Sequence, residues 1–229
     1  MPSHIFTRVG YWKESIAANQ ASVRAAKADK AFDQLHGQDY MVYAYLQLAQ
    51  DNNARAVIDD MAKSANFGPE ERGGPFALAA SPARYMVERG DWRGAAELEV
   101  RPSKFPFIIA ITHFARALGA ARAGNAEAAT ADNTKLAELR DQLREAKDAY
   151  WAEQVDIQWQ AASAWLLYAQ GKYDDALKTM SAAADAEDNT EKAPVTPGPL
   201  APARELYGAM LLERGMAKGA LAAYEATLK

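Results

Sequence analysis

No stretch of this chain alternates apolar and polar residues at the two-residue period of a β-strand. Apolar segments, helix-start signals and helix breakers instead predict helices that follow one another in pairs, with a short turn inside each pair. The expected pairs cover residues 2–9 with 12–29, 37–50 with 53–65, 76–89 with 92–99, 105–123 with 126–146, 149–170 with 173–187, and 201–214 with 217–228. We therefore expect an all-α fold.

Small residues recur at fixed distances from the turn inside each pair. The predicted turn residues are Gly10, Asp51, Gly90, Gly124, Gly171 and Gly215. Seven positions earlier stand Ser3, Ala44, Ala83, Ala117, Ala164 and Gly208, and five positions later stand Ser15, Ala56, Ala95, Ala129, Ala176 and Ala220. Two antiparallel helices approach closely only where neither carries a bulky side chain, so these positions predict the contacts inside helical hairpins.

The arrangement around each turn resembles the tetratricopeptide repeat. The segment from Leu206 to Tyr224 matches that family's pattern best: a small residue, a turn glycine, an alanine five positions later and an aromatic residue four positions after that. Aromatic residues also stand two positions after the turn glycine, at Trp12, Trp92 and Tyr173. The resemblance implies one repeat domain over residues 1–229, built as a right-handed superhelical array of about six hairpins at residues 2–29, 37–65, 76–99, 105–146, 149–187 and 201–228.

The first predicted pair has a short leading helix. About nine residues precede the turn at Gly10, where a full first helix of such a unit needs about fourteen. Either a capping half-helix begins the array, or the chain is the C-terminal part of a larger protein, similar to longer bacterial proteins of this repeat type. In both cases Ile5, Phe6 and Val9 lack a preceding repeat. We expect this edge to be covered by self-association as a two-fold dimer, or by an upstream repeat.

A proline-rich segment interrupts the helical pattern before the last pair. Residues 189–200 contain Pro194, Pro197 and Pro199, and proline lacks the N–H group that a helix interior requires. We expect an extended, exposed loop here, and the most protease-sensitive part of the chain.

The resemblance also implies that the exposed face of each first helix lines a concave groove. The candidate groove residues are His4, Arg8, Tyr45, Arg84, Phe114, Arg122, Trp165 and Tyr168. Aromatic side chains supply contact area and arginine donates paired hydrogen bonds to carboxylates, so the expected ligand is a protein or peptide segment with acidic or C-terminal carboxylate character. Core packing explains the aromatic residues equally well, whereas arginine is seldom fully buried without a partner.

Composition and charge exclude several classes of partner. The chain has 26 Lys and Arg residues against 30 Asp and Glu residues, and no basic cluster of the kind that follows a phosphate backbone, so we expect no nucleic-acid partner. The longest apolar run, Phe105 to Ala121, is interrupted by Pro106, His113 and Arg116, so we expect no membrane partner. Cysteine is absent, which leaves the compartment open between cytoplasm and periplasm.

Signals for catalysis are weak. The three histidines show no His-x-x-x-His spacing, and no nucleophile elbow, phosphate-binding glycine loop or dinucleotide motif occurs. His36 and Asp39 stand three positions apart, a spacing that fits one helix face and fits helix capping equally well. We therefore expect no catalytic residues, metal or cofactor, and a non-enzymatic binding or scaffold module. The alternatives are part of a larger hydrolase-like or metal-dependent enzyme that uses His4 and His36, and a structural oligomerisation module.

Overall fold

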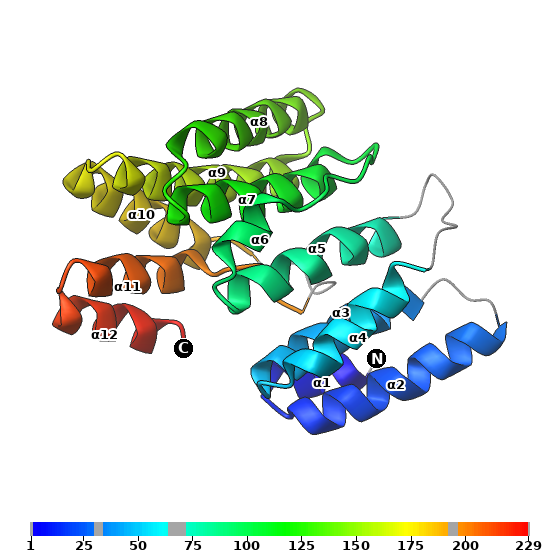
Figure 1. Ribbon diagram of the computed structural model, residues 1–229. Coiled ribbons are helices and arrows are strands. Elements are labelled where there is room, and N and C mark those ends of the chain that lie inside the picture. Colours follow the sequence, from blue (N-terminus) through cyan, green and yellow to red (C-terminus); the bar gives the residue numbers. More distant parts are fainter. Residues whose placement is uncertain (1, 30–33, 64–71, 192–196, 229) are drawn as a thin grey trace.

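The computed structural model describes residues 2–29, 34–63, 72–191 and 197–228. These residues form twelve helices and include no strand, which confirms the all-α expectation (Figure 1). The helices are α1 (Pro2–Arg8), α2 (Trp12–Asp29), α3 (Gln34–Gln47), α4 (Asp51–Met61), α5 (Gly73–Glu88), α6 (Trp92–Ala96), α7 (Pro106–Arg122), α8 (Ala126–Glu145), α9 (Ala149–Ala169), α10 (Tyr173–Asp188), α11 (Ala203–Glu213) and α12 (Ala217–Ala226).

Five of the six hairpin turns are built on the glycine that the sequence pattern indicates. Gly10, Gly90, Gly124, Gly171 and Gly215 all have a positive φ, between 64° and 81°. In this left-handed region a Cβ atom clashes with the backbone, so glycine ends the first helix of each hairpin without strain.

The prediction for the second turn was wrong by two positions. The left-handed residue there is Ala49, with φ of 53°, and Asp51 is already the first residue of α4. Because the register moves by two, the buried small residue of α4 is Ala54, and Ala56 is exposed. This turn has no glycine to mark it, and Asp51 was taken as the turn residue in place of Ala49.

The other predicted small residues lie where the helices of a pair meet. Eleven of the twelve are buried: Ser3, Ser15, Ala44, Ala83, Ala95, Ala117, Ala129, Ala164, Ala176, Gly208 and Ala220. The two helices of each hairpin pack against each other, α1 on α2 through α11 on α12. The fixed positions of the small residues therefore mark real contacts between the helices of each hairpin.

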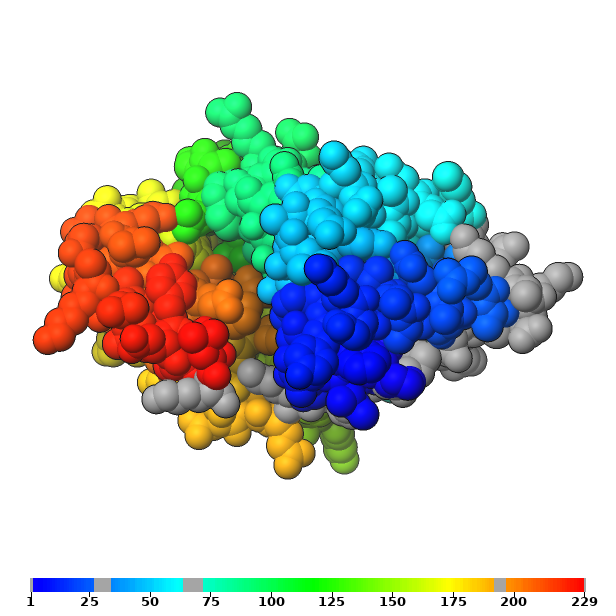
Figure 2. Space-filling view, turned by 90° about the horizontal axis from the view of Figure 1, so that it is seen from below, coloured from blue at the N-terminus to red at the C-terminus, as the bar shows by residue number. Residues whose placement is uncertain are grey.

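The first helices of the hairpins form an inner layer. Along the array α3 contacts α5, α5 contacts α7, α7 contacts α9 and α9 contacts α11, whereas α4, α8 and α12 pair mainly with helices next to them in sequence. Seen from below, the blue N-terminal hairpin and the red C-terminal hairpin lie on two sides of a hollow, with the orange part of the chain deeper between them (Figure 2).

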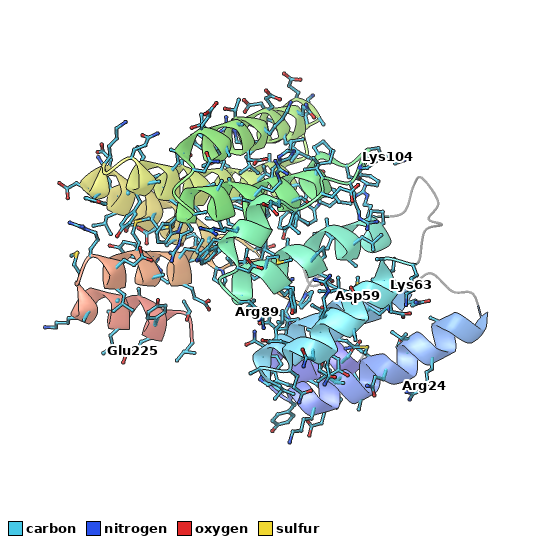
Figure 3. All side chains as sticks on the ribbon, viewed as in Figure 1. Arg24, Asp59, Lys63, Arg89, Lys104 and Glu225 are labelled. Atoms are coloured by element: carbon cyan, nitrogen blue, oxygen red, sulfur yellow. The ribbon has the colours of Figure 1, made fainter. Side chains whose placement is uncertain are left out.

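The outer surface carries the charge. Arg24, Lys104 and Glu225 point away from the ribbon and are exposed (Figure 3). Within the described part of the chain, no helix has both the length and the apolar character needed to cross a membrane.

Candidate functional site

One cavity of the molecule, called the main cavity below, lies against the inner layer of helices although shallower hollows elsewhere are larger. Its volume is about 240 Å³. Helices α3, α5, α7 and α9 supply most of its wall, and the segment 197–200, just before α11, Arg8 of α1 and Glu187 of α10 complete it. The lining residues are Arg8, Tyr43, Phe76, Ala80, Arg84, Phe107, Ile111, Tyr150, Trp151, Gln154, Val155, Gln158, Glu187, Pro197, Gly198, Pro199 and Leu200.

Aromatic rings form one wall of this cavity. Phe107 and Trp151 stack face to face, with ring centroids 4.0 Å apart and an interplanar angle of 6°. Phe76 lies 6.2 Å from Trp151 in a tilted orientation. Pro106 begins α7 and Asp148 caps α9 by accepting a hydrogen bond from the Trp151 backbone N–H, so both stacked rings stand near helix starts. The wall is aromatic and apolar, as a site for a ring requires.

Arg84 on α5 is the buried cation of the cavity. Only 1% of its surface is exposed. One terminal nitrogen donates a hydrogen bond of 3.0 Å to the Pro199 backbone carbonyl, and the guanidinium carbon lies 5.1 Å from the centroid of the Tyr43 ring. Its Nε atom has no hydrogen-bond partner, and no carboxylate of the described residues forms an ion pair with it. Burying a charge in this way is unfavourable unless something pairs with it.

Asp39 on α3 lies in the same polar region without reaching the arginine. It is 2% exposed and accepts a hydrogen bond of 3.0 Å from the Ser81 hydroxyl. Burial raises the pKa of the Asp39 carboxyl, and the nearby Arg84 charge and the Ser81 hydrogen bond act against that rise.

Two further polar side chains on the cavity wall come from α9 and α10. The Gln158 Oε1 atom is buried and has no hydrogen-bond partner among the described residues. Glu187 accepts a hydrogen bond of 2.7 Å from the backbone N–H of Ala203, the first residue of α11. Its carboxylate is thus bound to a helix N-terminus, where the free N–H groups and the helix dipole favour negative charge.

The segment 197–200 does not form the exposed loop that the sequence predicts. Leu200 is only 8% exposed and separates the main cavity from a neighbouring one of about 50 Å³. Pro197 and Pro199 have no N–H group to satisfy, which lowers the polar cost of burying this stretch. Residues 189–191 agree better with the predicted exposed loop, since Asn189 and Glu191 are exposed. The expectation for residues 192–196 lies outside the described residues.

The eight predicted groove residues do not share one pocket. Arg8 and Arg84 line the cavity. Tyr45 is 9% exposed and its hydroxyl accepts a hydrogen bond of 3.1 Å from Gln20 on α2. Phe114 and Trp165 are each 2% exposed and belong to the main hydrophobic core, so core packing explains their burial.

Arg122 and Tyr168 lie in a second cluster outside the cavity. The Arg122 guanidinium is 4.0 Å from the Trp165 ring centroid and 4.6 Å from that of Trp92, and it pairs with Glu213 at 2.7 Å. Tyr168 contacts Trp165, with centroids 5.2 Å apart. Arg122 is therefore satisfied by its own chain, whereas Arg84 is not.

The structure brings His4 and His36 together. Their Nε2 atoms are 3.1 Å apart, and the His4 ring stacks on Tyr40 at a centroid distance of 4.5 Å. Burial, then the positive charge of His36, lowers the pKa of His4. In the described ranges no group of three or more His, Cys, Asp or Glu side chains is placed to hold a metal ion.

His113 connects two helices of the same hairpin. Its Nδ1 atom lies 2.7 Å from the Asp132 carboxylate, which also accepts a hydrogen bond of 2.9 Å from Arg116. These side chains join α7 to α8, and none of them lines the cavity.

Sequence reasoning missed Gln158, Glu187 and the Pro199 carbonyl. Neither the glutamine nor the glutamate stands in a recognisable motif, and a backbone carbonyl carries no sequence signal. The available clue was an arginine on a first helix, which identified Arg84 but not its surroundings.

No protein-family model, curated protein or solved structure matches this chain. The tetratricopeptide resemblance therefore stays a prediction, and the functional argument rests on the chain's own residues.

Proposed function

We propose that this chain is a non-enzymatic binding module of the tetratricopeptide type, whose inner layer of first helices holds an extended protein or peptide segment. The continuous contacts of α3, α5, α7, α9 and α11 support this proposal, because they produce one long inner face. The observation that carries it is that this face already holds an irregular, non-helical segment of its own chain, residues 197–200.

From the segment 197–200 we infer how such a ligand would be held. Arg84 donates to a main-chain carbonyl, that of Pro199, and Leu200 inserts its side chain into the core. Pro202, at the start of α11, has φ of −56° and ψ of 131°, the values of a polyproline II conformation. A contact to a backbone carbonyl accepts many sequences, and the apolar side chain supplies selectivity. The expected partner is therefore an extended segment that presents a leucine beside proline.

The segment already in place competes with any partner. A group attached to the same chain acts at an effective concentration of about millimolar, so a free peptide binds the wild-type protein weakly. Replacing Leu200 with alanine removes the apolar anchor of this internal competitor and leaves Arg84 unchanged.

The test adds a fluorescent peptide with the sequence of residues 197–203, Pro-Gly-Pro-Leu-Ala-Pro-Ala, to the Leu200→Ala variant. Fluorescence anisotropy is expected to show tighter binding to Leu200→Ala than to the wild type. A matched peptide with aspartate in place of leucine is the control, and circular dichroism checks that the helices are retained. If the folded variant binds neither peptide, or binds both equally, the contact is internal packing and the proposal is wrong.

A further inference from the structure

The charges on the cavity wall do not balance. Arg8 and Arg84 are cationic, and Glu187 is the one acidic group on the described wall. That carboxylate already accepts the Ala203 N–H, and Asp39, behind the wall, has a pKa raised by burial. Arg84 is thus a buried guanidinium with a free Nε donor and no directly bound carboxylate among the described residues, and Asp39 and Glu88 act on it only through their charges. Such a group favours an anion in the cavity.

The size and walls of the cavity restrict what that anion can be. A cavity of about 150 Å³ admits one benzene molecule, and this one measures about 240 Å³. It has room for one ring and a few further atoms, but not for a nucleotide or a folded peptide. The stacked pair of Phe107 and Trp151 offers a flat apolar surface to such a ring.

From this geometry we infer that the cavity is a binding site for a small monocarboxylic acid with an apolar, preferably aromatic, body. The carboxylate pairs with the Arg84 guanidinium, and the ring packs against Phe107 and Trp151. Gln158 can turn its amide to meet a polar substituent, because its Oε1 atom has no protein partner among the described residues. The segment 197–200 stays in place as one wall, so this site does not require the peptide exchange proposed above.

The test titrates the wild-type protein with 3-phenylpropionate, indole-3-acetate and hexanoate in a calorimeter. At least one acid is expected to bind with a Kd below about 1 mM. The matched neutral probe is 3-phenylpropionamide, which keeps the ring and removes the charge. Losing one charge-assisted hydrogen bond should weaken its binding by about tenfold or more relative to 3-phenylpropionate.

Three variants locate the site. Arg84→Met should abolish binding of the acids. Ala80→Leu should do the same by filling the cavity, and it leaves the arginine intact in case Arg84→Met fails to fold. Arg140→Met is the matched control, because Arg140 also lies over an aromatic ring, 4.6 Å from the centroid of Trp159, but outside the cavity.

Several outcomes would overturn the inference. These are no binding of any of the three acids, equal binding of acid and amide, or undiminished binding by folded Ala80→Leu. Because this assay uses the wild-type protein and small acids, its result is independent of the peptide experiment on Leu200→Ala.

Discussion

At Gly119 a single residue sets how closely two helices approach. A Cβ atom added to this glycine of α7 would lie 2.5 Å from the Trp92 carbonyl oxygen and 2.6 Å from the Ala96 nitrogen, both backbone atoms of α6. Backbone atoms in a helix cannot move aside individually, so the whole short helix would have to shift.

Gly119→Ala should therefore destabilise the protein by about 1–3 kcal/mol, despite the better helix propensity of alanine. Gly219→Ala in α12 is the matched control. Its Cβ would meet only Leu211 Cδ1 at 3.5 Å, an ordinary contact, so this change should stabilise by up to about 1 kcal/mol. Urea unfolding of both variants measures the two values. Equal stabilities of Gly119→Ala and wild type would show that α6 is not held against α7 as described.

Residue spacing predicted which small side chains lie inside the hairpins, but not which aromatic residues face the ligand side. Phe114 and Trp165 were candidates for the groove and are core residues. The reason is that each first helix packs against its hairpin partner and against the first helices on either side. Aromatic residues suit all of these surfaces, so a helix position alone cannot distinguish them.

On the scale of elements, most helices begin and end within about three residues of the predicted limits. The largest difference is at the end of α4, which stops at Met61 instead of residue 65, and α6 ends at Ala96, three residues before its predicted limit. The backbone N–H of Leu98 donates a hydrogen bond within the turn that follows α6. The Leu98 carbonyl accepts a hydrogen bond of 2.9 Å from Arg116 on α7. A contact from another helix therefore ends α6, and such a contact has no local sequence signal.

The contact of α1 with α3 depends on the pair of His4 and His36. The pKa of His4 is lowered from its ordinary value of 6.5, first by burial and then by the His36 charge, with Arg8 acting in the same direction. A histidine with a lowered folded-state pKa takes up its proton more readily when the chain is unfolded. Its contribution to stability is therefore complete above pH 6.5 and is lost as the pH falls below that value.

We expect the free energy of unfolding of the wild type to fall, relative to that of His4→Asn, as the pH drops from about 8 to about 5.5. The experiment compares the two proteins, because the raised pKa of Asp39 changes the pH dependence of stability in the opposite direction. That contribution is the same in both proteins and cancels in the difference. His36→Asn should flatten the dependence only in part, because burial, the larger cause of the lowered His4 pKa, remains. Parallel curves for wild type and His4→Asn would contradict this account of the contact.

At the scale of the whole molecule, the inner layer follows from the repeat pattern, whereas the cavity does not. Arg84 and the carbonyl that it binds are 115 positions apart, and the partner lies in a segment whose prolines predict exposure. The array curves so that this segment meets the inner face, and that curvature is a sum of many helix contacts. Local periodicity describes each hairpin but not the surface that the hairpins build together.

Both ends of the array expose apolar side chains. At the N-terminal edge Ile5 is 68% exposed, Val9 56% and Tyr11 58%, while Phe6 is half-buried. At the C-terminal edge Leu212, Leu221 and Leu228 are also exposed. A two-fold contact buries one edge against the same edge of a second copy, so assembly stops at the dimer. A contact between the two different edges would instead continue into longer assemblies.

We expect the protein to form a dimer through the N-terminal edge, with a weight-average mass in sedimentation experiments that rises with concentration and stops at twice that of the monomer. Ile5→Glu places a charge in the middle of that contact and should shift the protein to the monomer. Leu221→Glu is the matched control at the other edge, where the same substitution should leave the dimer unchanged. Loss of association in Leu221→Glu alone would assign the contact to the C-terminal edge. Loss in both variants would indicate a head-to-tail contact, and a monomer at every concentration would show that neither edge drives association.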